Sequence, residues 1–380
     1  MTSIIAIIII IIYLILMGSL TYGFDNVETY KLQDLKANTK FSIIIPFRNE
    51  ANNLPKLLNS IFNLNYPKDL FEVILVDDDS SDNSVEVINN FITKKPFDCA
   101  QGDIIVIPNI RISNSPKKDA INSAIDIAKN EWIITTDADC VLPKYWLDTF
   151  DEYIQNETPN CIVAPVAYSQ NHSFFNRFQT LDFLSLQAAT IGGFGLKHPF
   201  LCNGANFAYR KTVFKSLNGF SGNSDIASGD DIFLLEKFKR LDVESVAYLK
   251  SAQAIVITNP VKSIGQLVQQ RLRWASKTSH NPNWFSKIVG FIVFFGNLVC
   301  VALPFLFVLS FIELRTALAL LVIKFAIDFL LLFKIARFFR QESVLLSYIF
   351  SSLLYPFFSV YVALLSLFKP YHWKGRVFKK

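Results

Sequence analysis

The chain has few cysteines, and their arrangement excludes two common ways of stabilising a domain. Only five cysteines occur in 380 residues, and no two are spaced Cys-x-x-Cys. Their number is odd and they are widely scattered, which argues against a disulfide framework and against a structural zinc site. We expect these cysteines to be reduced and mostly buried: Cys99, Cys140, Cys161, Cys202 and Cys300.

Charged residues are also scarce. They make up 18% of the chain, against about 25% in an average soluble domain. The net charge of +5 is too small and too dispersed to indicate a nucleic-acid-binding protein. Hydrophobic residues reach 51%, which excludes disorder as the main state and argues against a wholly soluble protein. The four histidines show no metal-ligand spacing.

The first apolar segment is an uncharged run over Ile4–Leu20. Its length is near the lower limit for crossing a bilayer, about 17 residues. A signal peptide cleaved near Gly18 is the alternative, but no Lys or Arg precedes the run, so we predict an uncleaved anchor over residues 1–22. The lysines that follow predict a cytoplasmic location for the next domain: Lys31, Lys36 and Lys40.

The second apolar region predicts about three membrane spans within residues 288–368. The middle segment contains Lys324 and Asp328, whose spacing places them on one helix face, where they can neutralise each other. We therefore expect a multi-pass protein of the cell (inner) membrane whose domain between the apolar regions faces the cytoplasm.

Basic residues flank the last apolar segment on both sides. They occur in the preceding loop and again in a basic tail over residues 369–380. One span cannot have both ends in the cytoplasm, so either this segment is a hairpin broken near Pro356 or the charge rule fails at one end.

Residues 40–287 have ordinary polarity and the length of one α/β domain. Apolar runs that predict strands alternate with helical patterns, which indicates a parallel sheet with right-handed crossovers. The expected strands lie near residues 41–46, 71–77, 103–108 and 131–136, and the expected helices span residues 49–63, 84–91 and 115–130.

Ligands bind at the carboxyl ends of the strands in such sheets. Three of the expected strands end in polar residues, which should all face one crevice. These residues are Arg48, Asn49 and Glu50 after the first strand, Asp77, Asp78 and Asp79 after the second, and Asp137 and Asp139 after the fourth.

Asp137 and Asp139 form a DxD pair behind an apolar strand. Their carboxylate oxygens are hard ligands that suit Mg²⁺ or Mn²⁺. Substrate phosphates often supply the remaining ligands of such an ion. The pair alone also fits a solvated turn, but the acids at Asp77–Asp79 favour the metal site. Mutual repulsion makes a run of three acids at a strand end costly in free energy. A carboxylate that accepts hydrogen bonds from a nucleobase or a ribose hydroxyl would explain why the run is there. No GxGxxG or Walker motif is present, which disfavours dinucleotide and P-loop sites.

Asp230 and Asp231 follow Gly229 and precede a predicted helix. They could simply stabilise the helix N-terminus. The functional alternative is that one acid caps the helix and the other serves as a general base.

The segment Gln270–Trp274 places Gln270, Arg273 and Trp274 on one helical side. Arg can grip a diphosphate, and Trp can stack on a sugar. The alternative is a basic aromatic helix on the membrane surface, and both can hold. Residues 174–196 are apolar and fit either an interfacial helix beside an acceptor or a core helix of the domain.

Together these motifs resemble membrane-bound glycosyltransferase family 2, in the branch with a QxxRW signature. The matching segments, in the family's order, are IIIPFRNE, ILVDDDSSD, KKDAIN, TTDADC, NGANFAYRK, GDDIFL and QRLRW. The resemblance covers residues 41–274, and the arrangement of anchor, domain and spans is similar too. It implies the GT-A nucleotide-diphospho-sugar transferase fold, with a parallel-rich mixed sheet and transmembrane helices at both ends.

The resemblance also implies site residues. Pro46, Asn49 and Glu50 would shape the nucleoside pocket, with Asp77 or Asp78 on the base. Lys117 would lie near the nucleotide, although Pro116 stands where the family has Gly. Asp137 and Asp139 would bind the sugar diphosphate and the metal. Asp231 would be the base, where the family more often has Glu-Asp in place of Asp230-Asp231. Gln270, Arg273 and Trp274 would close over donor and acceptor.

The expected reaction is metal-dependent, inverting sugar transfer from a nucleotide-diphospho-sugar to a lipid or a growing glycan at the membrane. One alternative is a processive polysaccharide synthase, which usually needs more spans than three or four. A second is a non-catalytic membrane scaffold with a decayed transferase domain, against which the intact acids at Asp78, Asp139 and Asp231 argue.

Overall fold

The computed structural model describes most of the chain, in two compact units. The described residues are 2–94, 103–170, 172–223, 229–280, 282–374 and 376–378. The helical unit comprises residues 1–27, 170–201 and 260–380, and the sheet unit comprises residues 28–169 and 202–259. Cys99 and the last two lysines of the basic tail lie outside the described residues.

The sheet unit contains a seven-stranded sheet with the strand order β3-β2-β1-β4-β7-β5-β8. Strands β3, β2, β1 and β4 are parallel, β7 is antiparallel to both its neighbours, and β5 and β8 are parallel to each other. The expectation of a mixed, mostly parallel sheet is therefore confirmed. The strands are β1 (Phe41–Phe47), β2 (Phe71–Asp77), β3 (Ile104–Pro108), β4 (Trp132–Thr135), β5 (Cys161–Val163), β7 (Phe207–Arg210) and β8 (Val246–Tyr248).

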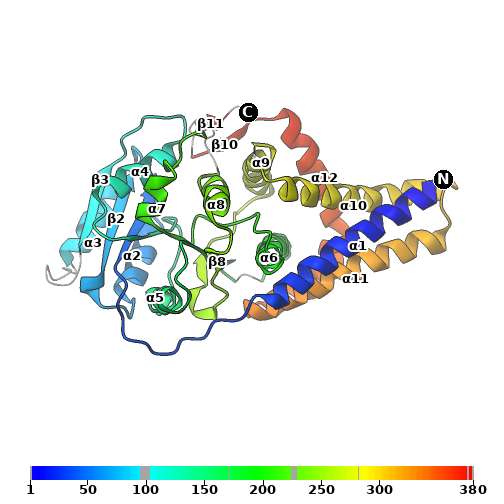
Figure 1. The fold of residues 1–380 in the computed structure, drawn as a ribbon. Coiled ribbons are helices and arrows are strands. Elements are labelled where there is room, and N and C mark those ends of the chain that lie inside the picture. Colours follow the sequence, from blue (N-terminus) through cyan, green and yellow to red (C-terminus); the bar gives the residue numbers. More distant parts are fainter. Residues whose placement is uncertain are drawn as a thin grey trace. The chain divides into compact units, whose positions relative to one another are not determined.

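Helices cover this sheet, as Figure 1 shows for the strands β2 and β3. Helix α2 contacts α3, and α4 packs against β1 and β2. A separate two-stranded sheet pairs β6 (Val166–Tyr168) with β9 (Val256–Thr258). The helices of this unit are α2 (Leu54–Phe62), α3 (Ser84–Lys94), α4 (Pro116–Ile127), α5 (Trp146–Glu157), α7 (Lys211–Ser216) and α8 (Asp230–Leu241), with short 3-10 turns η1 (Lys68–Leu70) and η2 (Ala252–Ala254).

The central strands are apolar almost throughout because both faces of the sheet are covered. In β1 and β2 the side chains of residues 43–45 and 73–76 are fully buried. The helix expected over residues 49–63 begins only at Leu54. Asn49 has a positive φ of 54°, which ends the strand in a tight turn before the helix starts.

The helical unit consists mainly of long apolar helices. Among the described residues, four are long and apolar enough to cross a membrane: Thr2–Asn26, Trp284–Val308, Leu314–Phe338 and Glu342–Phe368. The elements are α1 (Thr2–Asn26), α6 (Phe174–Gly195), α9 (Ile264–His280), α10 (Trp284–Val308), α11 (Leu314–Phe338), η3 (Glu342–Ser347), α12 (Tyr348–Phe368), β10 (Tyr371–Trp373) and β11 (Arg376–Phe378).

Helix α12 runs unbroken through Pro356, so the segment is not a hairpin broken at that residue. Proline is tolerated within membrane helices because neighbouring groups satisfy the backbone atoms that it frees. The side of the membrane on which each loop lies, and the limits of the membrane and catalytic domains, stay predictions.

Helices α1 and α6 approach each other closely at glycines. A Cβ atom at Gly23 or Gly195 would collide with backbone of the opposite helix, and one at Gly192 would collide with the Leu20 carbonyl. Small residues of this kind permit backbone contact between membrane helices. Helix α6 thus belongs with the apolar helices, which favours the interfacial interpretation over a core helix of the sheet domain.

Candidate active site

The candidate site lies at the carboxyl edge of the parallel strands. The strand order reverses between β1 and β4, since β2 lies on one side of β1 and β4 on the other. Such a switch point is where open α/β sheets bind ligands. The loops after β1, β2 and β4 carry the polar residues that the sequence predicted there, so the sheet brings the three groups to one edge.

Lys117 joins two acidic motifs that lie far apart in the sequence. Its Nζ atom lies 2.7 Å from Asp137 Oδ1 and 3.3 Å from Asp230 Oδ2. Pro116 occupies the first turn of α4, a position that suits proline, and does not prevent this reach. The side chains of Lys117 and Asp230 are 17% and 9% exposed, whereas that of Asp137 is 40% exposed. Asp137 is therefore the member of this cluster most open to a ligand.

The charges around Lys117 keep it protonated. Burial acts to lower its pKa, but the attraction of Asp137 and Asp230, with a contribution from Asp231, outweighs burial and raises the pKa well above its ordinary value. A raised pKa in the folded state means that this stabilisation is present at neutral pH and is lost only when the pH rises through that value. Lys117 is thus a permanent cation beside the two acidic motifs.

We expect Lys117→Gln to destabilise the sheet unit by about 3–5 kcal/mol, because it removes the cation that lies 3.3 Å from the nearly buried carboxylate of Asp230. Thermal unfolding of the full chain in detergent measures this loss. Lys129→Gln is the matched control, since Lys129 pairs with Asp103 on the exposed surface and its removal should change little. Equal unfolding temperatures for the two variants would contradict the structural role of Lys117.

Asp231 is oriented by backbone donors. Its Oδ2 accepts a hydrogen bond from the Gly204 N–H at 3.2 Å, and its Oδ1 accepts one from the Ile232 N–H at 2.8 Å. The N-cap residue Gly229 has a φ of 88°, which favours glycine. The two neighbouring acids therefore differ: Asp230 pairs with Lys117, and Asp231 is fixed by the main chain.

Gly204 belongs to another loop, which lies against this cluster. The Thr135 hydroxyl donates to the Gly204 carbonyl, which ties the loop to the end of β4. A Cβ atom at position 204 would lie 3.1 Å from Asp230 Oδ2 and 3.5 Å from Lys117 Nζ. Any side chain there would press on the ion pair.

We accordingly expect Gly204→Val to lower turnover by about 10- to 100-fold, since small displacements of reacting groups carry costs of that size. Initial rates of sugar transfer check this expectation. Gly265→Val is the control, because a Cβ at Gly265 meets nothing within 4 Å. Turnover that is equally unaffected in both variants would show that the Gly204 contact is unimportant.

Asp78 lies in a second cluster of the same edge. Its carboxylate accepts hydrogen bonds from Arg111 Nε at 2.8 Å and from the Asn109 amide at 2.8 Å. The Asn109 amide also donates to the Pro116 carbonyl at 3.0 Å. Asn109 thus links the Asp78 cluster to the residue preceding Lys117, so the acids after β2 and β4 belong to one connected arrangement.

The turn after β1 is held against the turn after β2. The Asn49 N–H donates to the Ser80 hydroxyl, and the Ser81 N–H donates to the Asn49 side chain. Glu50 is buried and accepts from the Asn53 amide. Two further predicted site residues lie at or near the ends of these strands. Pro46 lies within β1, and Asp77 Oδ1 accepts a hydrogen bond from the Ser80 N–H.

Asp137 and Asp139 provide hard oxygen ligands but not a complete metal site. Among the described residues, no group of three or more His, Cys, Asp or Glu side chains could hold a metal ion. Two carboxylates fit a divalent cation whose remaining ligands are diphosphate oxygens and water. The adjacent Cys140 is buried, which raises its thiol pKa, as do the charges of Asp139 and Asp137. A neutral thiol is a poor ligand for Mg²⁺ or Mn²⁺, so Cys140 is not expected to coordinate the cation.

The predicted residues Gln270, Arg273 and Trp274 lie on α9, in the helical unit. Arg271 lies within the same motif and forms a buried ion pair with Asp182 of α6 at 2.5 Å. Its guanidinium carbon lies 4.1 Å from the centre of the Trp274 ring, a cation–π contact. Arg271 therefore fixes the motif helix to α6.

Sequence reasoning missed Asn109 and Arg111. Both follow β3, the one parallel strand whose carboxyl end was not searched for polar residues. Applying the same rule to that strand would have found them. Gly204 lies in the segment NGANFAYRK that carries the resemblance, but the motif does not reveal its contact with Asp230 and Lys117, which depends on the folded path of the chain.

The mostly parallel mixed sheet gives this chain a GT-A-like α/β fold. Residues 42–217 match the family model described as glycosyl transferase family 2, and residues 132–368 match that of glycosyl transferase family group 2. The second match covers more than half of the chain. The chain belongs to the family 2 glycosyltransferases, so the predicted family is confirmed, whereas its QxxRW branch stays a prediction.

Two curated relatives are similar to parts of this chain. One is the poly-beta-1,6-N-acetyl-D-glucosamine synthase of Staphylococcus epidermidis, 26% identical over 62% of this chain and 53% of that protein. The other is the poly(ribitol-phosphate) beta-glucosyltransferase of Bacillus spizizenii, 36% identical over 26% of this chain and 15% of that protein. The chain thus spans about half or less of the length of these relatives.

Among solved structures, the fold is similar to that of the mannosyltransferase PcManGT of Pyrobaculum calidifontis, solved in complex with GDP-Man and Mn²⁺. The TM-score is 0.58 at 16% sequence identity, and the match covers 97% of this chain and 99% of that one. A likeness at this identity establishes the fold alone.

Proposed function

We propose that this glycosyltransferase moves a sugar from a nucleotide-diphospho-sugar to a membrane-associated acceptor, with inversion at the anomeric carbon. The observation that carries the proposal is the contact of Lys117 with both Asp137 and Asp230, next to Asp231. It brings the residues suited to the donor diphosphate beside a candidate base. The four apolar helices support a membrane-associated acceptor.

In this proposal Asp231 removes the proton from the acceptor hydroxyl. Its two backbone hydrogen bonds fix the carboxylate, so no reorientation is required when the proton moves. Asp230 has a different role, because its charge holds Lys117 in place. Lys117 supplies preorganised positive charge beside the donor phosphates. Asp78 and its partner Arg111 would recognise the nucleoside.

Asp137 and Asp139 would hold a divalent cation, Mg²⁺ or Mn²⁺. When bound, such a cation neutralises the departing nucleoside diphosphate. The exposed carboxylate of Asp137 supports this assignment, and the structural neighbour PcManGT contains Mn²⁺ with GDP-Man.

The QxxRW motif completes the proposal. By the resemblance to the family, Gln270, Arg273 and Trp274 would contact donor and acceptor. The domain over residues 40–287 would lie on the cytoplasmic side, where nucleotide sugars are made. The buried Arg271–Asp182 pair supports a fixed motif helix.

A processive polysaccharide synthase is the second candidate. The similarity to the poly-beta-1,6-N-acetyl-D-glucosamine synthase favours it. Product length decides between the two: single transfer gives an acceptor heavier by one sugar, whereas a synthase gives a ladder or a long polymer by mass spectrometry.

One experiment tests the proposed activity itself. Purified full-length chain in detergent is incubated with a panel of UDP- and GDP-sugars, with Mn²⁺, Mg²⁺ or EDTA. We expect binding and slow hydrolysis of one donor class, abolished by EDTA. Failure to bind any donor under all conditions would contradict the proposal and favour a decayed transferase domain.

A further inference from the structure

The helical unit contains a cavity among its apolar helices, and none of the residues of the Lys117 cluster lines it. Its volume is about 230 Å³, and it is lined by residues of α1, α6, α10, α11 and α12. Four of these helices belong to candidate membrane spans. Pockets for drug-sized ligands measure about 300–1,000 Å³, so this cavity fits only part of a larger molecule.

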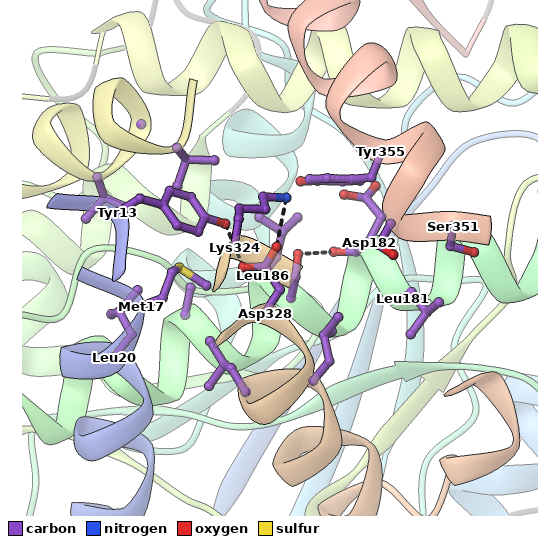
Figure 2. A pocket seen from close by; sticks show the side chains of 18 of the residues that line it. Tyr13, Met17, Leu20, Leu181, Asp182, Leu186, Lys324, Asp328, Ser351 and Tyr355 are labelled. Carbon is purple, nitrogen blue, oxygen red and sulfur yellow. Dashed lines mark hydrogen bonds and ion pairs between the residues drawn. The ribbon is translucent and has the colours of Figure 1, made fainter. Parts of the chain in front are cut away.

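The charges that face the cavity are paired. Figure 2 shows Lys324 between Asp328 and Tyr355. The Lys324 ammonium lies 2.8 Å from Asp328 Oδ2, and the Tyr13 hydroxyl donates to Asp328 Oδ1 at 2.7 Å. Lys324 is the one cation among the described lining residues, and it is 1% exposed. Its charge is already compensated, so an anionic ligand would find no spare cation.

The second lining carboxylate is compensated as well. Asp182 belongs to the cavity wall and pairs with Arg271, with side chains 5% and 7% exposed. A charged ligand group buried here would therefore lack a partner, which is costly in an apolar surrounding. The cavity favours an uncharged occupant.

The remaining lining is mostly apolar with a few hydroxyls. Met17, Leu20, Leu181 and Leu186 supply hydrocarbon surface. Ser351 also lines the cavity; it is buried, and its hydroxyl has no hydrogen-bond partner among the described residues. A buried hydroxyl of this kind can receive or donate one hydrogen bond to a neutral polar group. A glycan would need many more polar partners than this wall offers.

We propose that this cavity binds an uncharged lipid that carries a hydroxyl group, of the diacylglycerol type, as the acceptor of the transferase. The inference rests on the proposed function and names its acceptor class. The cavity holds the glycerol headgroup and the first methylene groups, and the remainder of the acyl chains stays in the bilayer. The wall residue Asp182 also fixes Arg271, which stacks on Trp274 of the motif helix, so the bound lipid lies next to the residues that orient this motif.

Gly290 allows the cavity to be filled without disturbing the fold. It lines the cavity on α10, and a Cβ atom there would meet nothing within 4 Å. Gly290→Leu should place a side chain in the space that the lipid needs. Gly18→Leu is the matched control, because Gly18 also faces open space within a candidate span but does not line the cavity.

The test measures binding without catalysis. Purified full-length chain in nanodiscs is labelled by a photoreactive diacylglycerol, with unlabelled diacylglycerol, a polyprenyl phosphate or a soluble oligosaccharide as competitor. We expect only diacylglycerol to compete. Gly290→Leu should reduce labelling by about tenfold or more, because its side chain clashes with the ligand. Gly18→Leu should leave labelling unchanged.

Ser351→Ala provides an independent variant that should fold normally, because it removes an unpaired buried hydroxyl. We expect labelling to fall by about three- to tenfold, the effect of one hydrogen bond. Better competition by the polyprenyl phosphate or the oligosaccharide, or unchanged labelling of Gly290→Leu, would overturn the proposal.

Donor binding in the same nanodiscs separates the two claims. Intact nucleotide-sugar binding without specific lipid labelling would refute the lipid site and leave the proposed function standing. Specific labelling without any donor binding would refute the proposed function and support a lipid site of another use.

Discussion

Replacing Asp231 with asparagine is expected to lower turnover by about 10²–10⁴-fold, the usual contribution of a general base. Asparagine has nearly the same shape and its oxygen can still accept from the Gly204 N–H, but it cannot take up the acceptor proton. Donor affinity should therefore stay within a few-fold of the wild-type value. Initial transfer rates and calorimetric donor binding measure the two quantities separately.

The control for this variant is Asp242→Asn, which changes an exposed acid at the C-cap of the same helix and should leave turnover unchanged. If Asp231→Asn retains near-normal turnover, Asp231 is not the base. If donor affinity collapses together with turnover, the substitution has disturbed the Lys117 cluster rather than proton transfer.

The second large effect concerns the cation. Asp139→Ala should weaken metal-dependent donor binding by about 100-fold or more, because a bound divalent ion contributes several kcal/mol of charge stabilisation and each 1.4 kcal/mol is tenfold. Titration of Mn²⁺ in the presence of a nucleoside diphosphate measures the loss. The residual binding should no longer respond to EDTA.

Asp126→Ala is the matched control, since Asp126 is an exposed acid on α4 of the same unit. It should bind metal and donor like the wild type. An unchanged dependence on metal in Asp139→Ala would rule out the DxD pair as the cation site.

The parallel part of the sheet could be predicted from the sequence because its strands are long and apolar. The runs at β1 and β2 are interrupted only where polar residues begin, so both the strands and their carboxyl ends were visible. Strands β5 and β8 have three residues each, which is too short for a periodic pattern. Their place in the mixed sheet came only through the resemblance to the family.

Most residues of the candidate site could be predicted from the sequence, but the contacts between them could not. The acids at strand ends identified Asp137 and Asp139 by a local rule, and the resemblance pointed to Lys117. That Lys117 contacts Asp230 as well as Asp137 depends on the path of the chain between them, which no spacing reveals. The role of Arg271 in fixing the motif helix was hidden for the same reason, since its partner Asp182 lies on a different helix.

The long apolar helices were predictable from length and composition, whereas their packing was not. Gly23, Gly192 and Gly195 permit the contact between α1 and α6, and a glycine in an apolar run does not indicate its partner. Lys324 and Asp328 were expected to neutralise each other, and the structure pairs them at 2.8 Å.

The central claim is that Lys117, Asp137, Asp139 and Asp231 surround one activated sugar. A cryo-electron microscopy structure of the full chain in nanodiscs, with Mn²⁺ and a non-hydrolysable nucleotide sugar, tests it most directly. The account predicts diphosphate density between Lys117 and the Asp137–Asp139 pair, with the anomeric carbon facing Asp231. Donor density at any other place in the chain, with these four side chains unoccupied, would contradict it.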